Sequence, residues 1–304
     1  MELRHLRYFV AVAEELHFGR AAIRLGMAQP PLSQQIRQLE GELGVQLLSR
    51  TRRRVELTDA GRVFLVAAHD ILARAGAAIE AARRAQRGEI GALRVGFAGS
   101  AAYEVMPLMV RAYRDRYRDV DVTLREMTTL EQIDALQGDR LDVGFARMPV
   151  SNPALAVEVV RREPFLVALP EGHPLTMRDR IPARALADEP FILLPRHWQS
   201  GFYDAVIAYC HAQGFSPHVL QEATEFHTIV GLVAAGLGVS LVPAAVSNLR
   251  GRGVAYRQLE GEPPQAELAI IWRKNDISRV LGAFLAVVRE LAAGMPDGPE
   301  QVDP

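Results

Sequence analysis

Short polar side chains and one arginine recur at helical spacing in a segment that starts at Gln29 and Pro30. They are Ser33, Gln34, Arg37 and Gln38. Hydroxyl, amide and guanidinium groups are the ones that hydrogen-bond base edges in the major groove of DNA. The chemistry that this set predicts is the reading of a DNA sequence, with the first residues of the segment beside the DNA.

Four arginines follow shortly after, in a stretch whose pattern is strand, basic turn, strand between residues 44 and 58. They are Arg50, Arg52, Arg53 and Arg54. Guanidinium groups on a hairpin tip suit phosphate oxygens, which position a protein on DNA without reading its sequence. We therefore expect a winged helix-turn-helix.

A second chemical pattern lies in the back half, where polar residues follow predicted strands. In α/β sheets, ligands collect at the carboxyl ends of strands and at helix N-termini, and an arginine there could hold a carboxylate with two hydrogen bonds. An apolar wall is expected from Phe202 or Trp198. The residues expected to line this site are Gly99, Ser100, Thr128, Thr129, Arg147, Phe202 and Phe226.

The expected ligand is a small organic anion, a carboxylate that could be aromatic, with no other cofactor and no metal. Each residue also has a plainer interpretation. Ser100 and Thr129 have the side chains of ordinary helix N-caps, and Arg147 fits a surface arginine.

Two helices must position the DNA-reading set. Gly26 ends the first, and Pro30-Pro31 begins the second, because proline is tolerated only in a first turn. Leu32, Ile36, Leu39 and Leu43 form one buried stripe. A helical hairpin that only packs a core would show the same spacing.

A long helix is predicted from Asp59 to Arg87, with Thr58 as its N-cap. One row of small and apolar residues is spaced alternately by four and three: Phe64, Ala68, Ile71, Ala75, Ala78, Ala82 and Ala85. This is a coiled-coil seam, which indicates a dimerisation helix. The alternative is a core helix of a single domain.

After a polar hinge at 83–91, strands and helices alternate, which predicts a mostly parallel sheet covered by helices. We expect a DNA-binding domain at 1–58, a linker helix and hinge at 59–90, and a two-lobed α/β domain at 91–304. Lobe I would comprise 91–162 and 267–304, and lobe II 163–266, with crossovers near 162 and 266.

The composition agrees with this division. Residues 1–90 hold 14 arginines and 10 carboxylates, a net charge of +4, whereas residues 91–304 carry −5. Only the front part is expected to meet nucleic acid. No apolar run reaches the length of a membrane span, no signal peptide is visible, and the lone Cys210 fits a reducing cytoplasm.

Enzyme signatures are missing from the sequence. Gly236-Leu237-Gly238 lacks the third glycine and the strand-to-helix order of a dinucleotide fingerprint. No Gly-x-Ser-x-Gly elbow or paired metal-ligand motif occurs. Two other functions are less well matched. A solute-binding protein would account for the back half only, and an architectural DNA-binding protein would not need the back half.

One long set of motifs resembles the winged helix of LysR-type transcriptional regulators. It comprises Leu3-Arg4-His5-Leu6-Arg7-Tyr8-Phe9-Val10, Ala21-Ala22-Ile23-Arg24-Leu25, Gln29-Pro30-Pro31-Leu32-Ser33 and Leu57-Thr58-Asp59-Ala60-Gly61. The rest of the chain is similar in length and order. The resemblance implies a bacterial regulator that binds a double-stranded operator.

The resemblance also implies a homotetramer, a sensing domain of the periplasmic-binding-protein type, and RNA polymerase as a further partner. Gly99-Ser100, Thr129, Arg147 and Phe202 are similar to effector-cleft positions of the benzoate, catechol and chlorocatechol regulators. Arg196-His197-Trp198-Gln199 departs from that group, which leaves the ligand's identity open.

Overall fold

The computed structural model describes residues 1–50, 54–197, 200–249 and 251–295. They form two compact units, Met1–Arg84 and Ala85–Pro304, and each is described by itself. No helix within the described ranges is long and apolar enough to cross a membrane.

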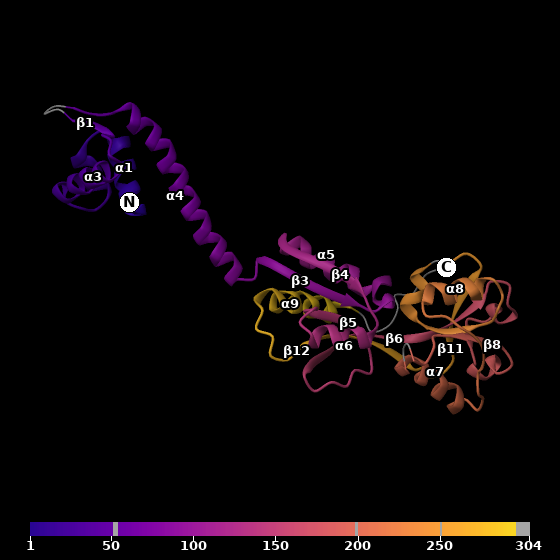
Figure 1. Ribbon diagram of the computed structural model, residues 1–304. Coiled ribbons are helices and arrows are strands. Elements are labelled where there is room, and N and C mark those ends of the chain that lie inside the picture. Colours follow the sequence, from indigo (N-terminus) through magenta and orange to yellow (C-terminus); the bar gives the residue numbers. More distant parts are fainter. Residues whose placement is uncertain (51–53, 198–199, 250, 296–304) are drawn as a thin grey trace. The chain divides into compact units, whose positions relative to one another are not determined.

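Three helices packed around one core open the first unit (Figure 1): α1 Leu3–Glu15, α2 Phe18–Arg24 and α3 Gln29–Leu43. Gly26 follows α2 with a φ of 66°, a conformation that glycine adopts without strain. The prolines fall in the first turn of α3, and Leu32, Ile36 and Leu39 are fully buried beneath it. The predicted helix-turn-helix is therefore confirmed, with its polar face turned away from the core.

The wing is a two-stranded antiparallel sheet, β1 Leu48–Arg50 and β2 Val55–Leu57. Its tip, with Arg52 and Arg53, lies outside the described residues. Helix α4, Asp59–Gln86, follows it. The N–H of Gly61 donates to Thr58 Oγ1 at 2.9 Å, which confirms the predicted N-cap.

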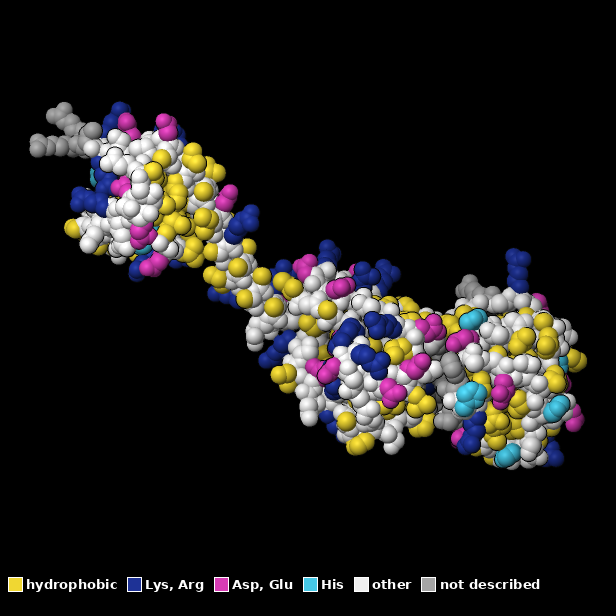
Figure 2. Space-filling model, in the orientation of Figure 1, with side chains coloured by type: hydrophobic (Ala, Val, Ile, Leu, Met, Phe, Trp, Pro, Cys, Tyr) yellow, Lys and Arg dark blue, Asp and Glu magenta, His cyan; other side chains and the backbone are white. Residues whose placement is uncertain are grey.

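The seam of α4 divides into two parts. Ala68 is buried and Phe64 packs edge-on against Phe9, with ring centroids 5.2 Å apart, so the first turns belong to the core of unit 1. Further along, Ile71 and Ile79 are 38% and 52% exposed. Figure 2 shows hydrophobic side chains on the surface along this helix. The second part of the seam is the part that a partner chain could still cover.

The second unit starts with lobe I. Its main elements are β3 Ile90–Phe97, α5 Val105–Arg116, β4 Asp119–Glu126, α6 Thr129–Gln137, β5 Val143–Arg147, β12 Gln265–Arg273 and α9 Arg279–Gly294. Val143 and Phe145 of β5 pack with α5 and α9, whereas Ala146 packs with α6 on the opposite face. The alternation of strand side chains thus places one helix layer on each face of the sheet.

Lobe II follows. Its elements are β6 Leu155–Pro170, η2 Pro174–Met177, β7 Arg180–Ile181, η3 Ala183–Leu186, β8 Pro190–Leu193, α7 Ser200–Ala212, β9 His218–Glu222, α8 Phe226–Ala234, β10 Ser240–Pro243, η4 Ala244–Leu249 and β11 Val254–Leu259. Cys210 of α7 is buried, and burial raises the pKa of its thiol to about 11. It packs as a small apolar residue, as expected.

The parallel pairing expected from the alternating pattern is confirmed for the first strands of lobe I but does not extend through the whole main sheet. Strands β4, β3 and β5 are parallel, but β12 runs antiparallel to β5 and to β6. Within the described residues the main sheet has eight strands, in the order β4-β3-β5-β12-β6-β11-β7 with β10 also on β6. Strand β6 has 16 residues and passes from one lobe into the other beside β12.

A 3-10 turn, η1 Gly99–Tyr103, precedes α5 in lobe I. This turn follows the end of β3. Just before it, the N–H of Ala98 donates to the carbonyl of Phe145 at 2.9 Å. The turn carries Gly99 and Ser100, two residues of the predicted ligand site.

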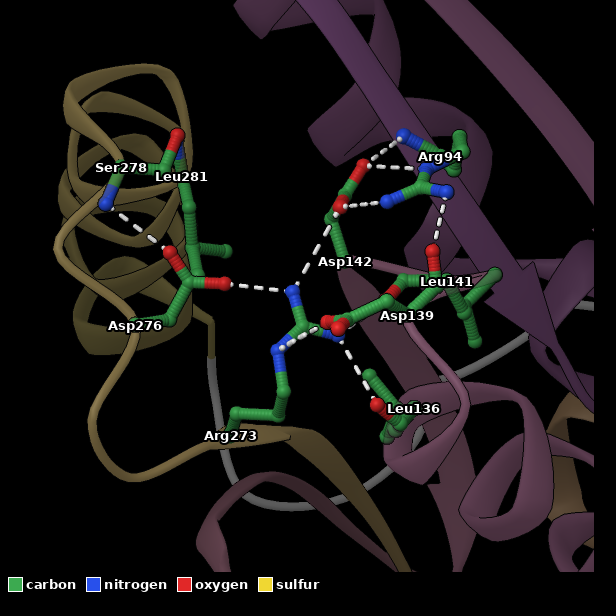
Figure 3. A network of polar contacts seen from close by, with 9 residues as sticks. All are labelled: Arg94, Leu136, Asp139, Leu141, Asp142, Arg273, Asp276, Ser278 and Leu281. Atoms are coloured by element: carbon green, nitrogen blue, oxygen red, sulfur yellow. Dashed lines mark hydrogen bonds and ion pairs between the residues drawn. The ribbon is translucent and has the colours of Figure 1, made fainter.

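A charged network braces lobe I at the other end of the sheet (Figure 3). The guanidinium and backbone N–H of Arg94 donate to the carboxylate of Asp142 at 2.6 to 3.0 Å. Arg273 reaches Asp142 at 3.6 Å and Asp276 at 2.6 Å. Burial alone raises the pKa of Asp142, but the bonds from Arg94 outweigh it and the pKa is lowered. The network joins β3, β12 and the start of α9.

Candidate functional site: a DNA-reading helix and a cleft between lobes

The polar face of α3 is unoccupied by other parts of the described chain. Gln29, Pro30, Gln34 and Arg37 are exposed, and Ser33 is half-buried. Ser33, Gln34 and Arg37 take part in none of the hydrogen bonds or ion pairs among the described residues. Their side chains remain available to base edges, as the sequence predicts.

Arg50 has a protein partner that the sequence did not reveal. Its guanidinium pairs with Glu40 at 2.6 Å and lies 5.0 Å from the centre of the Phe18 ring. Glu40 also accepts from the backbone N–H groups of Leu47 and Leu48 at 3.0 and 3.1 Å. Arg50 and Glu40 thus fasten the wing to α3, whereas Arg54, 3.0 Å from Glu56, stays largely exposed.

Hydrogen bonds among the amides beside this polar face were not evident from the sequence. His5 is 1% exposed, and its Nε2 lies 3.0 Å from Gln35 Oε1. Gln38 lies between Gln35, at 3.4 Å, and Glu42, at 3.1 Å. Gln38 is therefore less free than Gln34 to turn toward a base.

A cavity of about 170 Å³ lies between the two lobes of the second unit. Lobe I supplies the ends of β3 and β4 and the start of α6, and lobe II supplies the end of β8 and the start of α8. The lining residues are Ala98, Gly99, Ser100, Glu126, Met127, Thr128, Glu131, Leu194, Thr224, Glu225 and Phe226.

Four of the seven predicted ligand residues line this cavity: Gly99, Ser100, Thr128 and Phe226. Ser100 is 4% exposed, and its Oγ accepts from Arg147 Nε at 2.9 Å. Thr128 is the N-cap of α6, and its hydroxyl and N–H both donate to Glu131 at 2.9 and 2.7 Å. The cap orients the N-terminus of α6 toward the cavity.

The other three predicted residues stand behind the wall. Thr129 Oγ1 contacts the backbone of Arg147, accepting from its N–H at 3.2 Å. Arg147 is 5% exposed and pairs with Glu163, itself 2% exposed, at 2.8 Å. Phe202 packs between Phe165 and Phe226, with ring centroids 4.9 and 5.3 Å away. All three support the cavity from outside, and Trp198 lies outside the described residues.

Carboxylates are the lining residues that the sequence did not reveal. Glu126, Glu131 and Glu225 border the cavity, and no lysine, arginine or histidine is among its described lining residues. Burial first, and then the charge of Glu126, raises the pKa of Glu225. Burial, and then the charges of Glu225 and Glu126, raise the pKa of the nearby Tyr103 to about 12. The cavity is therefore acidic, and any carboxylate bound there must rely on hydroxyl and N–H donors.

Comparison with known protein families matches nearly the whole chain. Residues 3–62 match the model of the bacterial regulatory helix-turn-helix protein, lysR family, and residues 86–293 match the LysR substrate binding domain. The transcriptional regulator AlsR of Bacillus subtilis is 44% identical over 94% of this chain and 95% of its own length.

Solved structures agree in fold. Full-length CbnR in complex with its target DNA is 32% identical, covers 96% of this chain and 100% of its own, and has a TM-score of 0.86. The effector binding domain of BenM with its effector benzoate is 28% identical, covers 70% of this chain and 98% of its own, and has a TM-score of 0.62.

Proposed function

Because this chain belongs to the LysR family of bacterial transcriptional regulators, we propose that its cleft binds a small organic acid and that this binding changes how the protein engages its operator. The chain is a DNA-binding regulator with an effector-binding domain, and its relatives are named as regulators rather than enzymes. The identity of the bound group and the residues that hold it are the proposal.

The observation that carries this proposal is the cavity itself. Both lobes line it, and it contains the buried hydroxyl of Ser100 and the N-terminus of α6. The first N–H groups of a helix lack intrahelical acceptors and favour negative charge, so they suit a carboxylate. An acid held there and touching lobe II would favour one arrangement of the lobes over another, and only such a difference lets a ligand shift an equilibrium.

The test is a thermal-shift screen of the full chain against small aromatic and aliphatic acids, since a ligand of the folded state raises the melting temperature. Ser100→Ala and Thr129→Val should bind operator DNA but need a higher effector concentration in a reporter titration. A response identical to that of the unaltered protein in both variants would place the effector elsewhere.

On the DNA side, we propose that α3 enters the major groove and that the arginine wing contacts phosphates. Two copies would then read half-sites separated by one or more helical turns, ~34 Å each. The effector should change the length of the DNase footprint or the DNA bend more than the total affinity. An unchanged footprint at saturating effector would count against this coupling.

We further propose a dimer through the exposed part of the α4 seam and, from the family resemblance, a tetramer that works with RNA polymerase in the cytoplasm. The exposed side chains at Ile71 and Ile79 support the dimer. Changing both Ala75 and Ala78 to Glu places charges in the seam and should give monomers by light scattering. A monomeric unaltered protein at micromolar concentration would refute the proposal.

A further inference from the structure

Two carboxylates from opposite lobes converge beside Gly99. Glu126 ends β4 in lobe I, and Glu225 precedes α8 in lobe II. A Cβ atom on Gly99 would lie 2.6 Å from Glu126 Oε1 and 3.0 Å from Glu225 Oε2. Gly99 therefore keeps open a space that both carboxylates border.

Neither carboxylate has a partner among the described residues. The side chains of Glu126 and Glu225 form no hydrogen bond or ion pair there. Glu131, the third carboxylate of the cavity, is held instead by the N–H and hydroxyl of Thr128. Two like charges thus face one small space. His227 acts on Glu225 from outside the cavity lining, and no cationic side chain is among the described residues that border the space itself, so an ammonium group would relieve the repulsion there.

Ser100 supplies an independent sign of a ligand. It is 4% exposed in the cavity wall, and its Oγ accepts from Arg147, but no described contact takes its proton. The hydroxyl therefore still has a proton that it can donate to an acceptor in the cavity. At the start of α6, Thr128 and Glu131 line the cavity but bond to each other, so the helix donors still without a described acceptor are the next N–H groups, those of Thr129 and Leu130.

We propose that the effector is a small zwitterion of the amino acid class, with its ammonium between Glu126 and Glu225 and its carboxylate on Ser100 and the N-terminus of α6. This inference rests on the proposed function, because it assumes that the cleft is the effector site. An ammonium has three donors and can use one carboxylate from each lobe. Binding would therefore draw the two lobes together.

A bare metal ion fits this space less well. Within the described part of the chain, no group of three or more His, Cys, Asp and Glu side chains is placed to hold a metal. Two carboxylates satisfy an ammonium, whereas calcium takes six to eight oxygen ligands and magnesium six. The acidic pair is better matched by an organic cation.

The experiment is a thermal-shift screen of the full chain with the twenty amino acids, followed by calorimetry on the best one. The same calorimetry uses two relatives of that amino acid, the acid without its amino group and the amine without its carboxylate. We expect each relative to bind roughly tenfold or more weakly, because a hydrogen bond to a charged group is lost. Magnesium and calcium chlorides should give no shift.

Two variants and one control locate the ammonium. Glu126→Gln and Glu225→Gln should each weaken binding of the amino acid about tenfold or more. They should also reduce the ratio of its affinity to that of the deaminated acid. Glu222→Gln, an exposed carboxylate on β9 outside the cavity lining, controls for general charge and should bind like the unaltered protein.

The outcomes separate the two proposals. If simple acids stabilise the protein through Ser100 while no amino acid does, or if the deaminated acid binds equally well, the zwitterion is refuted and the acid-binding cleft stands. A metal chloride that reproduces the shift also refutes the zwitterion. If neither amino acids nor acids raise the melting temperature, both proposals fail.

Discussion

The polar side chains of α3 and those around the cleft are used in opposite ways. On α3, Ser33, Gln34 and Arg37 make no hydrogen bond within the described chain. Around the cleft, Thr128 and Arg147 are bound to other protein groups. The face predicted to read DNA keeps its polar groups free, whereas the predicted ligand cleft uses polar groups to hold its own wall.

The largest effect should come from Glu163→Ala, which tests the support of the cleft. The change leaves Arg147 buried without its counter-charge and removes the acceptor of the Ala245 N–H, 2.5 Å away. Breaking a buried pair from one side typically costs ~3–5 kcal/mol. Urea unfolding measures it, with Glu222→Ala as the exposed control. A loss no larger than the control's would show that the wall does not depend on this pair.

Asp142→Asn tests whether support far from the cavity matters as much. It should lower the free energy of unfolding by ~1.5–3 kcal/mol at pH 7, because charge-assisted bonds from Arg94 are lost. The pKa of Asp142 is lowered in the folded state, so its contribution is present above the unfolded value of about 3.9 and is lost as the pH falls further.

The measurement for Asp142 is therefore a pair of urea titrations, at pH 7 and near pH 3. The gap between the two proteins should shrink at the lower pH, because Asp142 takes up a proton in the unfolded chain before it does so in the folded one. A gap that is constant across this range would mean that the network of Figure 3 does not act through the charge of Asp142.

Gln34→Ala tests the other side of the comparison. It should reduce discrimination between operator and random DNA by ~1–3 kcal/mol, because a bidentate base contact is lost. Stability should change by less than ~0.5 kcal/mol, since Gln34 is exposed. Competition gel shifts against operator and random duplexes give the ratio.

Arg52→Ala is the matched control for Gln34. Loss of a phosphate contact should weaken binding to both DNAs equally and flatten its salt dependence. If Gln34→Ala and Arg52→Ala give the same discrimination and the same salt slope, the division into base-reading and phosphate-binding residues is wrong.

The smallest effect is expected from Thr128→Ala, which removes the N-cap of α6. Loss of a cap costs ~1 kcal/mol, and Thr128→Ser should restore most of it. Urea unfolding of both variants measures this difference. Equal stability of the alanine and serine variants would indicate that the hydroxyl does not stabilise α6 and is free to bind a ligand.

The winged helix could be predicted closely because its signals are local. Gly26 and the two prolines punctuate the turn, and Leu32, Ile36 and Leu39 define the buried stripe within one helix. Once that stripe is known, the polar face follows from the helical repeat alone.

The cleft and the central sheet were predicted less well because their residues come from distant segments. Strand β6 contains Glu158, Arg161 and Glu163, charges that conceal a strand in the sequence. They are tolerated because Arg161 pairs with Glu104 and Glu163 pairs with Arg147, contacts that no local pattern reveals. Glu126 and Glu225 are also far apart in the sequence, so their closeness in space could not be predicted from it.

The antiparallel pairing of β6 and β12 also bears on how this protein could have been assembled. Glu163 and Ala266, which stand near the two ends of lobe II, are direct neighbours across the ladder, about 5 Å apart. The chain therefore passes from lobe I into lobe II and back again at two residues that are paired across neighbouring strands. Because its two ends lie so close together, lobe II has the geometry of a segment inserted as one unit into lobe I.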